Sequence, residues 1–225
     1  MEVTNDDDRA RPVPGAPADV VELHFVTETA ALGGLVRLDV RGAAGATRLL
    51  VAVVRSGEPN VVVVDHELPV PRHSFELRAP GVWVELGCET PLDHWTVGLE
   101  AFGLVLDRGE VASPVSRGER VPVGLDLDLD TTAPPARTGD GFHLPVRVHG
   151  DVLVADARYG IDTQGTRFRR WDGRRPLVPP RPADETPGGS LAVSWPEEDG
   201  PPAEERWAWY GGSAPGWAAL DAQSA

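Results

Sequence analysis

The sequence predicts an all-β fold, in the form of an antiparallel β-barrel or a curled sandwich with little helix. From residue 20 onward, short runs rich in Val, Leu and aromatic residues recur, and apolar and polar side chains alternate along them. Turn-forming stretches such as 42–46 (GAAGA) and 56–60 (SGEPN) separate these runs. No window of a dozen residues carries the apolar stripe of an amphipathic helix, so a sheet that closes or curls is expected.

Each run predicts one strand, bounded by the turn-forming residues on either side. Residues 1–18 combine an acidic run with Pro, Ala and Gly, so they bury too little apolar surface to order and are expected to form a disordered tail. The predicted strands are 20–27, 35–41, 47–54, 60–66, 73–78, 82–88, 94–107, 120–130, 142–154, 158–161, 167–171, 191–195 and 206–210.

Most of these strands are expected to form one β-barrel domain over residues 19–175. The remainder, 176–225, begins with a loop rich in Pro and Arg and continues with the strand-like pieces LAVSW and RWAWY, which PEEDGPPAEE separates. We expect this remainder to form a Pro-rich loop and a terminal hairpin that complete the same domain, followed by a short tail.

The clearest alternation lies in 120–130 (RVPVGLDLDLD), where Val and Leu face one side and Asp126, Asp128 and Asp130 face the other. One face of this strand is therefore expected to contact solvent. A calcium-binding loop is the alternative for a D-x-D-x-D run. However, Thr131 stands where that loop needs glycine and Arg137 stands where it needs an acid, so calcium is not expected.

Composition and charge exclude several classes of partner. The formal net charge is −14, and the 21 basic residues are all Arg, so the chain would repel a phosphate backbone and no nucleic-acid partner is expected. Cys88 is the single cysteine, which excludes an intramolecular disulfide and a thiolate metal cluster. The aliphatic runs are too short to span a bilayer, so we expect a cytoplasmic protein without membrane insertion. The sequence gives no oligomeric state.

The stretch 88–102 (CETPLDHWTVGLEAF) gathers acids, a histidine and a tryptophan in and beside a predicted strand. Alternation divides the strand into an apolar face (Trp95, Val97, Leu99, Ala101) and a second face (His94, Thr96, Gly98, Glu100, Phe102). One interpretation is a half-buried strand with a polar outer face. In the other, the polar face lines the interior of the barrel, where His94 and Glu100 would orient a ligand or transfer a proton. The sequence leaves both open.

Metal ions and nucleotide cofactors are not expected. His143 and His149 share one face of their strand but lie about 20 Å apart, too far to bind one metal ion together. The chain has no H-x-H or H-E-x-x-H spacing, no G-x-G-x-x-G segment and no phosphate-binding loop. Cys88 could pair with His94 as a nucleophile, but it falls on an apolar face and we interpret it as a core residue. The segment 211–216 (GGSAPG) only approaches the pattern of a nucleophilic serine and is interpreted as a turn.

Three stretches together resemble a known superfamily: 81–107 (GVWVELGCETPLDHWTVGLEAFGLVLD), 118–131 (GERVPVGLDLDLDT) with 145–154 (PVRVHGDVLV), and 161–173 (IDTQGTRFRRWDG). Over residues 20–175 the chain is similar to an uncharacterised actinobacterial branch of the carotenoid hydratase (hydroxyneurosporene synthase) and AttH-like superfamily, whose fold is built from lipocalin-like β-barrels. Family members carry a G-x-R-D-H-S-W-G segment. Gly165, Arg167 and Trp171 match this segment here, whereas Phe168, Arg169 and Arg170 replace its Asp, His and Ser.

The resemblance implies an apolar cavity that holds a terpenoid, steroid-like, fatty or polyketide ligand, because superfamily members include cofactor-independent hydratases and pericyclic cyclases. We expect the protein to bind such a molecule in a β-barrel cavity, and an enzyme would hydrate, isomerise or cyclise it with His94 and Glu100 as the catalytic residues. A non-catalytic ligand-binding or protein-interaction module of the same fold is the alternative. The expected ligand-binding residues are Glu89, Trp95, Asp126, His149, Arg167 and Trp171.

Overall fold

The computed structural model describes residues 2–9, 16, 18–41, 45–107, 109–171, 188–195, 203–210 and 216–220. These residues form strands and turns and contain no helix, as the period-two alternation predicts. Accordingly, none of the residues described belongs to a helix with the length and apolar character needed to cross a membrane. The strands are β1 (Asp19–Val26), β2 (Leu32–Arg41), β3 (Ala46–Arg55), β4 (Asn60–Leu68), β5 (Phe75–Ala79), β6 (Val82–Thr90), β7 (His94–Leu106), β8 (Val111–Ala112), β9 (Arg120–Thr131), β10 (Ala136–Arg137), β11 (Gly141–Val154), β12 (Ala157–Arg170), β13 (Gly189–Trp195), β14 (Ala203–Tyr210) and β15 (Gly216–Leu220).

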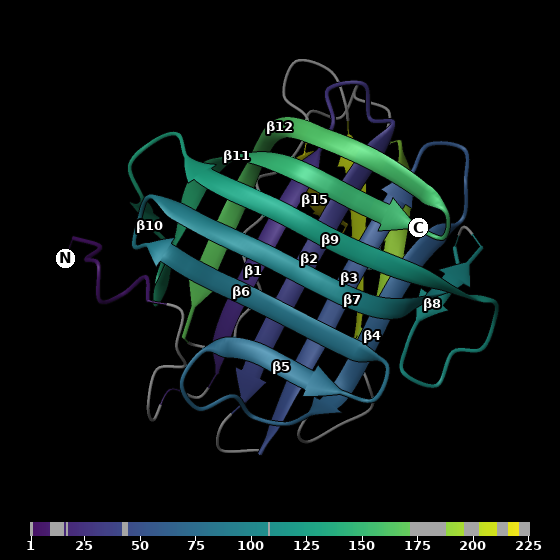
Figure 1. The fold of residues 1–225 in the computed structure, drawn as a ribbon, viewed down its shortest axis with the longest axis horizontal. Helices are drawn as coiled ribbons and strands as arrows, with labels where there is room; N and C mark the ends of the chain where they lie inside the picture. The colour runs from purple at the N-terminus through teal and green to yellow at the C-terminus, as the bar shows by residue number, and fades with distance from the viewer. Residues whose placement is uncertain are drawn as a thin grey trace.

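Hydrogen bonds close the main sheet into a ring. Around this ring, β9, β11, β12, β1, β2, β3, β4 and β7 pair in that order, each antiparallel to its neighbours, and β7 returns to β9. The long strand β7 pairs with β6 along its first part and with β4 along its last three residues, Leu104 to Leu106. The β5–β6 hairpin therefore extends the sheet beyond the ring (Figure 1). This arrangement confirms the predicted all-β, barrel-like fold class.

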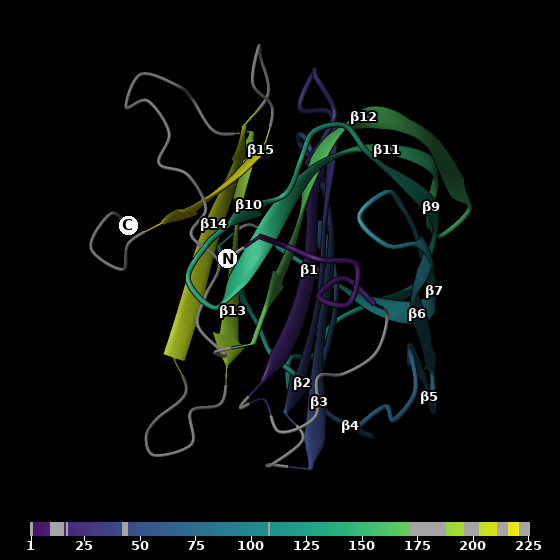
Figure 2. The same ribbon diagram turned by 90° about the vertical axis from the view of Figure 1, so that its left-hand side faces the viewer.

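The strands lie in three layers (Figure 2). We call β5, β6, β7, β9 and β11 the outer wall and β1 to β4 the middle wall, and the strands of these two walls cross each other in Figure 1. β8, β13, β14 and β15 form the terminal sheet, which covers the other face of the middle wall. Within the terminal sheet β8 pairs parallel to β13 and the other pairs are antiparallel.

Two apolar cores hold the layers together. Side chains that point inward from the outer and middle walls pack into one cluster, which includes Phe25, Phe75, Trp95 and Phe142 among its largest fully buried members. A second cluster joins the middle wall to the terminal sheet, and its aromatic members are Trp195, Trp207, Trp209 and Trp217. Burial of one large apolar side chain contributes about 1.5–3 kcal/mol. Because both of its faces are covered, the middle wall is buried along nearly the whole of β1, β2 and β3.

The predicted C-terminal hairpin is present, since β13 and β14 pair antiparallel along their length. It lies outside the ring of strands, in the terminal sheet that packs on the middle wall. The expected tail is wrong for residues 216–220, which pair with β14 as β15 because Trp217 is buried in the second core. Outside the described residues lie 176–187, from the predicted Pro-rich loop, and 211–215, from the turn predicted at 211–216.

The disordered tail expected over residues 1–18 is wrong for residues 2–9, which we call the N-terminal strap. Val3 joins the first core and Asp8 is completely buried. A buried carboxylate is stable only with hydrogen-bond donors or a cation beside it, and the buried guanidinium of Arg167 supplies both. Residue 1, residues 10–15 and residue 17 lie outside the described part of the chain.

The predicted pieces 158–161 and 167–171 belong to one strand, β12, which pairs with β11 over its whole length. Gly165 looks like an interruption in the sequence. In the structure this glycine lies where a Cβ atom would approach the carbonyl oxygen of His24 to 2.7 Å, so it allows β12 to lie close to β1. The strands β8 and β10 contain two residues each, too few for periodicity to predict.

Candidate functional site

The polar face of β7 lies on the outside of the barrel. Trp95, Val97, Leu99 and Ala101 belong to the first core, whereas His94, Thr96, Glu100 and Phe102 alternate on the outer surface. The interpretation in which this polar face lines the interior is therefore wrong, and the half-buried strand with a polar outer face is confirmed. The inward-facing side chains along Val82–Leu86, Trp95–Ala101 and Val123–Leu129 are apolar and belong to the first core, so a His or Glu placed among them would lose its hydration without compensation.

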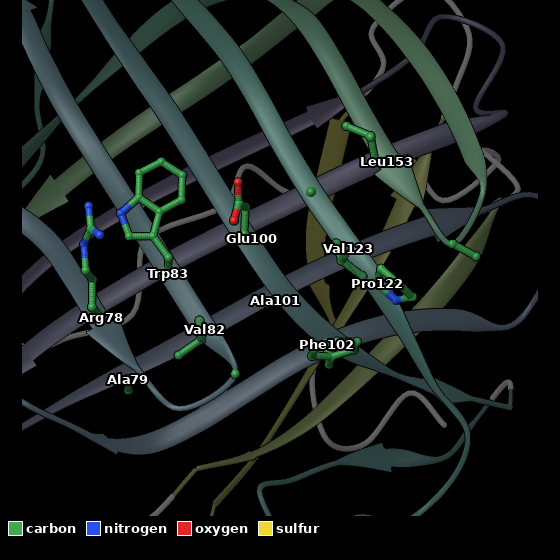
Figure 3. A pocket seen from close by; sticks show the side chains of 13 residues that line it. Arg78, Ala79, Val82, Trp83, Glu100, Ala101, Phe102, Pro122, Val123 and Leu153 are labelled. Atoms are coloured by element: carbon green, nitrogen blue, oxygen red, sulfur yellow. The ribbon is translucent and has the colours of Figure 1, made fainter.

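A hollow of about 580 Å³ lies on this outer surface, over β6, β7 and β9 and beside the β11–β12 turn (Figure 3). It is open to solvent, and carbon atoms make up most of its surface. Phe102 and Leu153, which line it, are 55% and 38% exposed. The other large side chains of the lining are Arg78, Trp83, Glu100 and Pro122.

Trp83 is held in place along one side of the hollow. Its ring covers the backbone of Gly98 on β7, since a Cβ atom at Gly98 would lie 2.7 Å from the far edge of the indole. The indole N–H of Trp83 donates to Glu76 Oε1 over 3.2 Å, and Arg78 donates to the same oxygen over 2.9 and 2.8 Å. Glu76 and Arg78 are thus bonded to each other, and the face of the Trp83 ring forms an apolar wall of the hollow.

Glu100 is the acidic side chain of the hollow and lies between Trp83 on β6 and Gly124 on β9 in the strand register. His94, the other expected catalytic residue, is six residues earlier on the same face of β7. At about 3.3 Å per residue the two side chains are about 20 Å apart. They cannot act on the same bond of one small ligand.

His94 instead meets His149 at Asp130, on three adjacent strands of the outer wall. His94 Nδ1 lies 2.8 Å from Asp130 Oδ1, and His149 Nε2 lies 2.9 Å from Asp130 Oδ2. The second ring nitrogen of His94 lies 3.2 Å from Asp128. We call His94, Asp128, Asp130 and His149 the outer histidine cluster. All four side chains are part-exposed.

The hydrogen bonds of this cluster shift the pKa values of its members. The bond to Asp130 is the main reason that the pKa of His94 lies above its ordinary 6.5. In the reverse direction, hydrogen bonds from His94 and then His149 hold the pKa of Asp130 below its ordinary 3.8. Between these two pKa values His94 and Asp130 are both charged and form an ion pair, and the same carboxylate is also hydrogen-bonded to His149.

Two of the expected ligand-binding residues belong neither to the lining of the hollow nor to the outer histidine cluster. Asp126 is exposed on β9, opposite Gly98 and Asp151, and Glu89 is exposed near the end of β6. Cys88 packs partly buried against the first core, while His94 faces outward, so Cys88 is a core residue as interpreted from the sequence.

Trp95 and Arg167, both expected to bind a ligand, come together inside the barrel at the N-terminal strap. The guanidinium of Arg167 lies 4.2 Å from the centre of the Trp95 ring, and both side chains are bonded to Asp8. Burial is the main reason that the pKa of Arg167 lies below its ordinary value, and Asp8 opposes this shift. Trp171 packs nearby, with its ring 6.1 Å from that of Phe142, which Arg167 also approaches.

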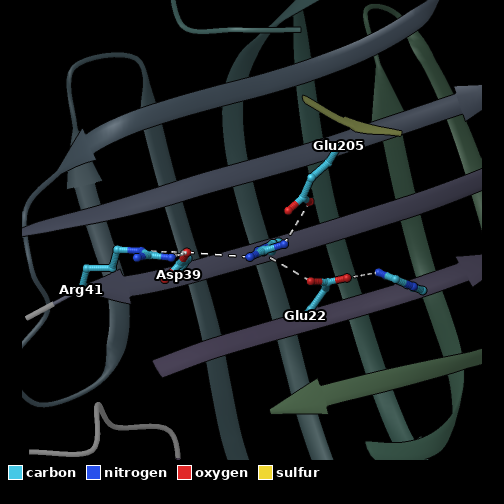
Figure 4. A network of polar contacts seen from close by, with 6 residues as sticks. Glu22, Asp39, Arg41 and Glu205 are labelled. Atoms are coloured by element: carbon cyan, nitrogen blue, oxygen red, sulfur yellow. Dashed lines mark hydrogen bonds and ion pairs between the residues drawn. The ribbon is translucent and has the colours of Figure 1, made fainter. Parts of the chain in front are cut away.

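A second set of charged side chains lies between the middle wall and the terminal sheet (Figure 4). Arg37 lies 3.7 Å from Glu22, 3.8 Å from Asp39 and 3.3 Å from Glu205 of β14. Glu22 is also hydrogen-bonded to His24. Burial tends to raise the pKa of Glu22, but His24 and Arg37 together outweigh it, so this pKa lies below its ordinary value. We call Glu22, His24, Arg37, Asp39 and Glu205 the buried polar layer.

The sequence did not predict the burial of Asp8 or of the buried polar layer. It also did not predict that Trp83 and Phe102 line a hollow on the outer surface. The pattern VELHF in β1 and VRLDVR in β2 resembles a strand with a solvated face, and nothing local indicates the sheet that covers it. Asp8 stands in an acidic run, NDDD, and its partner Arg167 is 159 residues away. A usable signal was present only for Phe102, as an apolar residue on an otherwise polar face.

Neither a family nor a metal site is assigned to the protein. No protein-family model, curated protein or solved structure matches the chain. Among the residues described, no group of three or more His, Cys, Asp and Glu side chains is arranged to hold a metal ion.

Proposed function

We propose that the protein binds an apolar small molecule in the hollow lined by Trp83, Phe102, Pro122 and Leu153. The observation that carries this proposal is an open, carbon-lined hollow of about 580 Å³ that includes a phenylalanine 55% exposed to solvent. Ligand sites commonly have volumes of about 300–1,000 Å³. Covering apolar surface gains about 25 cal/mol per Å², so a ligand seated against Phe102 and Leu153 would be held chiefly by contact with carbon.

The ligand class remains the one expected from the sequence, namely a terpenoid, steroid-like, fatty or polyketide molecule. Its place changes, because His94 and Glu100, which an interior cavity would need on its lining, face outward. Membership of the carotenoid hydratase and AttH-like superfamily, its lipocalin-like barrel and a cytoplasmic location are predictions that rest on the sequence alone.

Binding without conversion is the function we propose. A cofactor-independent hydration or cyclisation needs an acid and a base placed around one reacting group. Glu100 lines the hollow, but His94 lies about 20 Å from it along β7 and bonds to Asp130. Glu100 therefore serves as a polar anchor at the edge of an apolar ligand.

Titration with Nile red, a neutral apolar dye, tests the proposal through the rise in dye emission. We expect Phe102→Ala to weaken dye binding by about tenfold, which corresponds to about 1.4 kcal/mol. Gly124→Leu should weaken dye binding as well, because the new side chain would occupy part of the hollow that Gly124 lines. The substitution fits the backbone, since a Cβ atom at this position would lie 3.4 Å from Leu153, an ordinary van der Waals contact.

Val115→Ala is the matched control, because Val115 is 84% exposed and does not line the hollow. This variant should bind the dye like the wild type. Equal weakening by Val115→Ala and Phe102→Ala, or unchanged binding by Gly124→Leu, would show that the dye binds elsewhere and would overturn the proposal.

A further inference from the structure

The carboxylate of Asp8 is bound in the way that proteins bind the carboxylate of a ligand. Arg167 donates to Oδ1 over 2.6 Å, while the indole N–H of Trp95 and the backbone N–H of Leu92 donate to Oδ2 over 3.0 and 2.6 Å. Charge-assisted hydrogen bonds of this kind are about twice as strong as neutral ones. Asp8 is completely buried, so these donors supply its solvation.

The donors belong to the barrel and not to the N-terminal strap. Arg167 lies on β12, Trp95 on β7, and Leu92 in the turn between β6 and β7. Arg167 stacks on Trp95 at 4.2 Å, and β7 and β12 are fixed in the ring of strands. The arrangement of donors is thus set by the barrel.

One further observation indicates that the site offers more than Asp8 uses. Arg167 is 2% exposed, yet its Nη1 atom has no hydrogen-bond partner among the residues that the structure describes, so Asp8 uses only part of the guanidinium. A carboxylate that is free to reorient can bind guanidinium with two parallel hydrogen bonds. The φ of 62° at Leu92 sets the direction of its N–H toward Asp8 Oδ2.

Apart from the guanidinium of Arg169, which bonds to the backbone oxygen of Asp7, the described surroundings of the carboxylate are apolar. Phe142 and Trp95 contact the guanidinium, and Cys88, Leu92 and Trp171 pack against the same core. The strap itself brings an aliphatic side chain, Val3, into this core together with the carboxylate of Asp8. A molecule with the same two features would carry one carboxylate on an apolar body.

We propose that the Arg167–Trp95–Leu92 site is a binding site for an apolar monocarboxylic acid, which the N-terminal strap occupies within the same chain. Asp7, bonded through its backbone oxygen to Arg169 over 3.0 Å and through its side chain to Arg137 over 3.1 Å, keeps Asp8 next to the site. A tethered competitor acts at an effective concentration in the millimolar range. The acid therefore binds only when it displaces Asp8, so the strap sets the concentration of acid that is needed for binding. This site is separate from the hollow and does not depend on the function proposed for it.

The test uses the full chain with Asp8→Ala, which removes the competing carboxylate and leaves every donor in place. Acetate, its neutral analogue acetamide, and hexanoate are titrated while the indole N–H signal of Trp95 is followed by NMR, assigned with Trp95→Phe. We expect acetate to bind the variant at least about tenfold more tightly than the wild type. Hexanoate should bind more tightly than acetate because of its apolar body, and acetamide should not distinguish the two proteins.

Each other result overturns the proposal. If acetate binds Asp8→Ala no better than acetamide does, the donors form an internal ion pair and not a carboxylate site. If hexanoate binds no better than acetate, the site does not accept an apolar acid. Should Asp8→Ala fail to fold in buffer, recovery of folded protein by hexanoate and not by hexanamide supports the site, and equal or no recovery overturns it.

Discussion

The buried polar layer and the outer histidine cluster are built from the same kinds of side chain at alternate positions of antiparallel strands. In the first, Glu22, His24, Arg37 and Asp39 project from β1 and β2 and are each less than 5% exposed. In the second, His94 and Asp130 project from β7 and β9, and their side chains are 29% and 48% exposed. The difference is the terminal sheet, which covers one face and not the other. The strength of a charge pair in this protein therefore depends on the layer above it, more than on the residues that form it.

Removing the central cation of the buried polar layer should have the largest effect. Arg37→Met keeps much of the side-chain volume but leaves Glu22, Asp39 and Glu205 without their shared partner. Loss of one member of a buried ion pair costs about 3–5 kcal/mol. We expect a decrease of this size in the free energy of unfolding, measured by urea denaturation.

Arg147→Met is the matched control on the outer wall. Arg147 makes two hydrogen bonds of 2.8 Å to Asp162, but both side chains are more than half exposed. Exposed ion pairs contribute little to stability because water and salt screen them. We expect no resolvable change in the urea midpoint. Equal effects of the two substitutions would mean that the terminal sheet does not exclude water from the buried polar layer.

The pH dependence of stability should show an intermediate effect, through His66. Its ring stacks on Trp195 of the terminal sheet at 5.2 Å, and burial, followed by Arg48, lowers its pKa from 6.5 to about 4. Since the folded pKa lies below the unfolded one, the unfolded chain binds the proton more tightly, and stability falls as the pH decreases from 6.5 towards 4. The shift corresponds to an upper limit of about 3.4 kcal/mol, which solvent screening reduces because the His66 side chain is only part-buried.

His66→Phe keeps a stacked ring and removes this titration. Urea midpoints of the variant should fall less steeply than those of the wild type between pH 6.5 and 4. A contribution with the same sign from His143, whose pKa burial also lowers, should remain in the variant. Identical pH profiles for the two proteins would show that His66 is solvated and that the terminal sheet does not cover β4.

Local periodicity predicted the strands and their faces, but not what lies over each face. The alternation of β7 correctly separated Trp95 and Leu99 from His94 and Glu100. The same rule applied to β1 and β2 indicates a solvated face for Glu22 and Arg37, and it fails because the covering strands lie far away in the sequence. Alternation indicates that a strand has two different faces, but only tertiary contacts determine which of these faces is buried.

The candidate site shows the same limit. His94 and His149 were both selected from the sequence, but their meeting at Asp130 depends on the register of β7, β9 and β11. A slip of one residue in either pair would turn Asp130 to the opposite face. Trp95 and Arg167 were also selected, whereas Asp8 was assigned to a tail, because a single carboxylate in an acidic run carries no sign of a distant arginine.

The smallest effect on stability, with a clear effect on titration, is expected for Asp130→Asn. The amide keeps the shape of the carboxylate but removes its charge, so the pKa of His94 should fall towards 6.5, which NMR titration of the ring proton measures. The stability that His94 derives from its raised pKa is present below 6.5 and lost as the pH rises through the folded pKa. The corresponding contribution of Asp130 is present above 3.8 and lost as the pH falls through its lowered pKa.

At pH values between the lowered pKa of Asp130 and the raised pKa of His94, the wild type should be slightly more stable to unfolding than Asp130→Asn. The difference is small because the pair is exposed and solvent screens it. Raising the salt concentration should therefore move the wild-type pKa of His94 towards that of Asp130→Asn, while the titration of His66 beneath the terminal sheet should hardly respond. A His94 pKa that does not respond to the substitution but still falls as salt is added would mean that the imidazole takes its shift from Asp128 alone. In that event the outer histidine cluster would be two separate pairs, and its contrast with the buried polar layer would be one of connectivity as well as of solvent exposure.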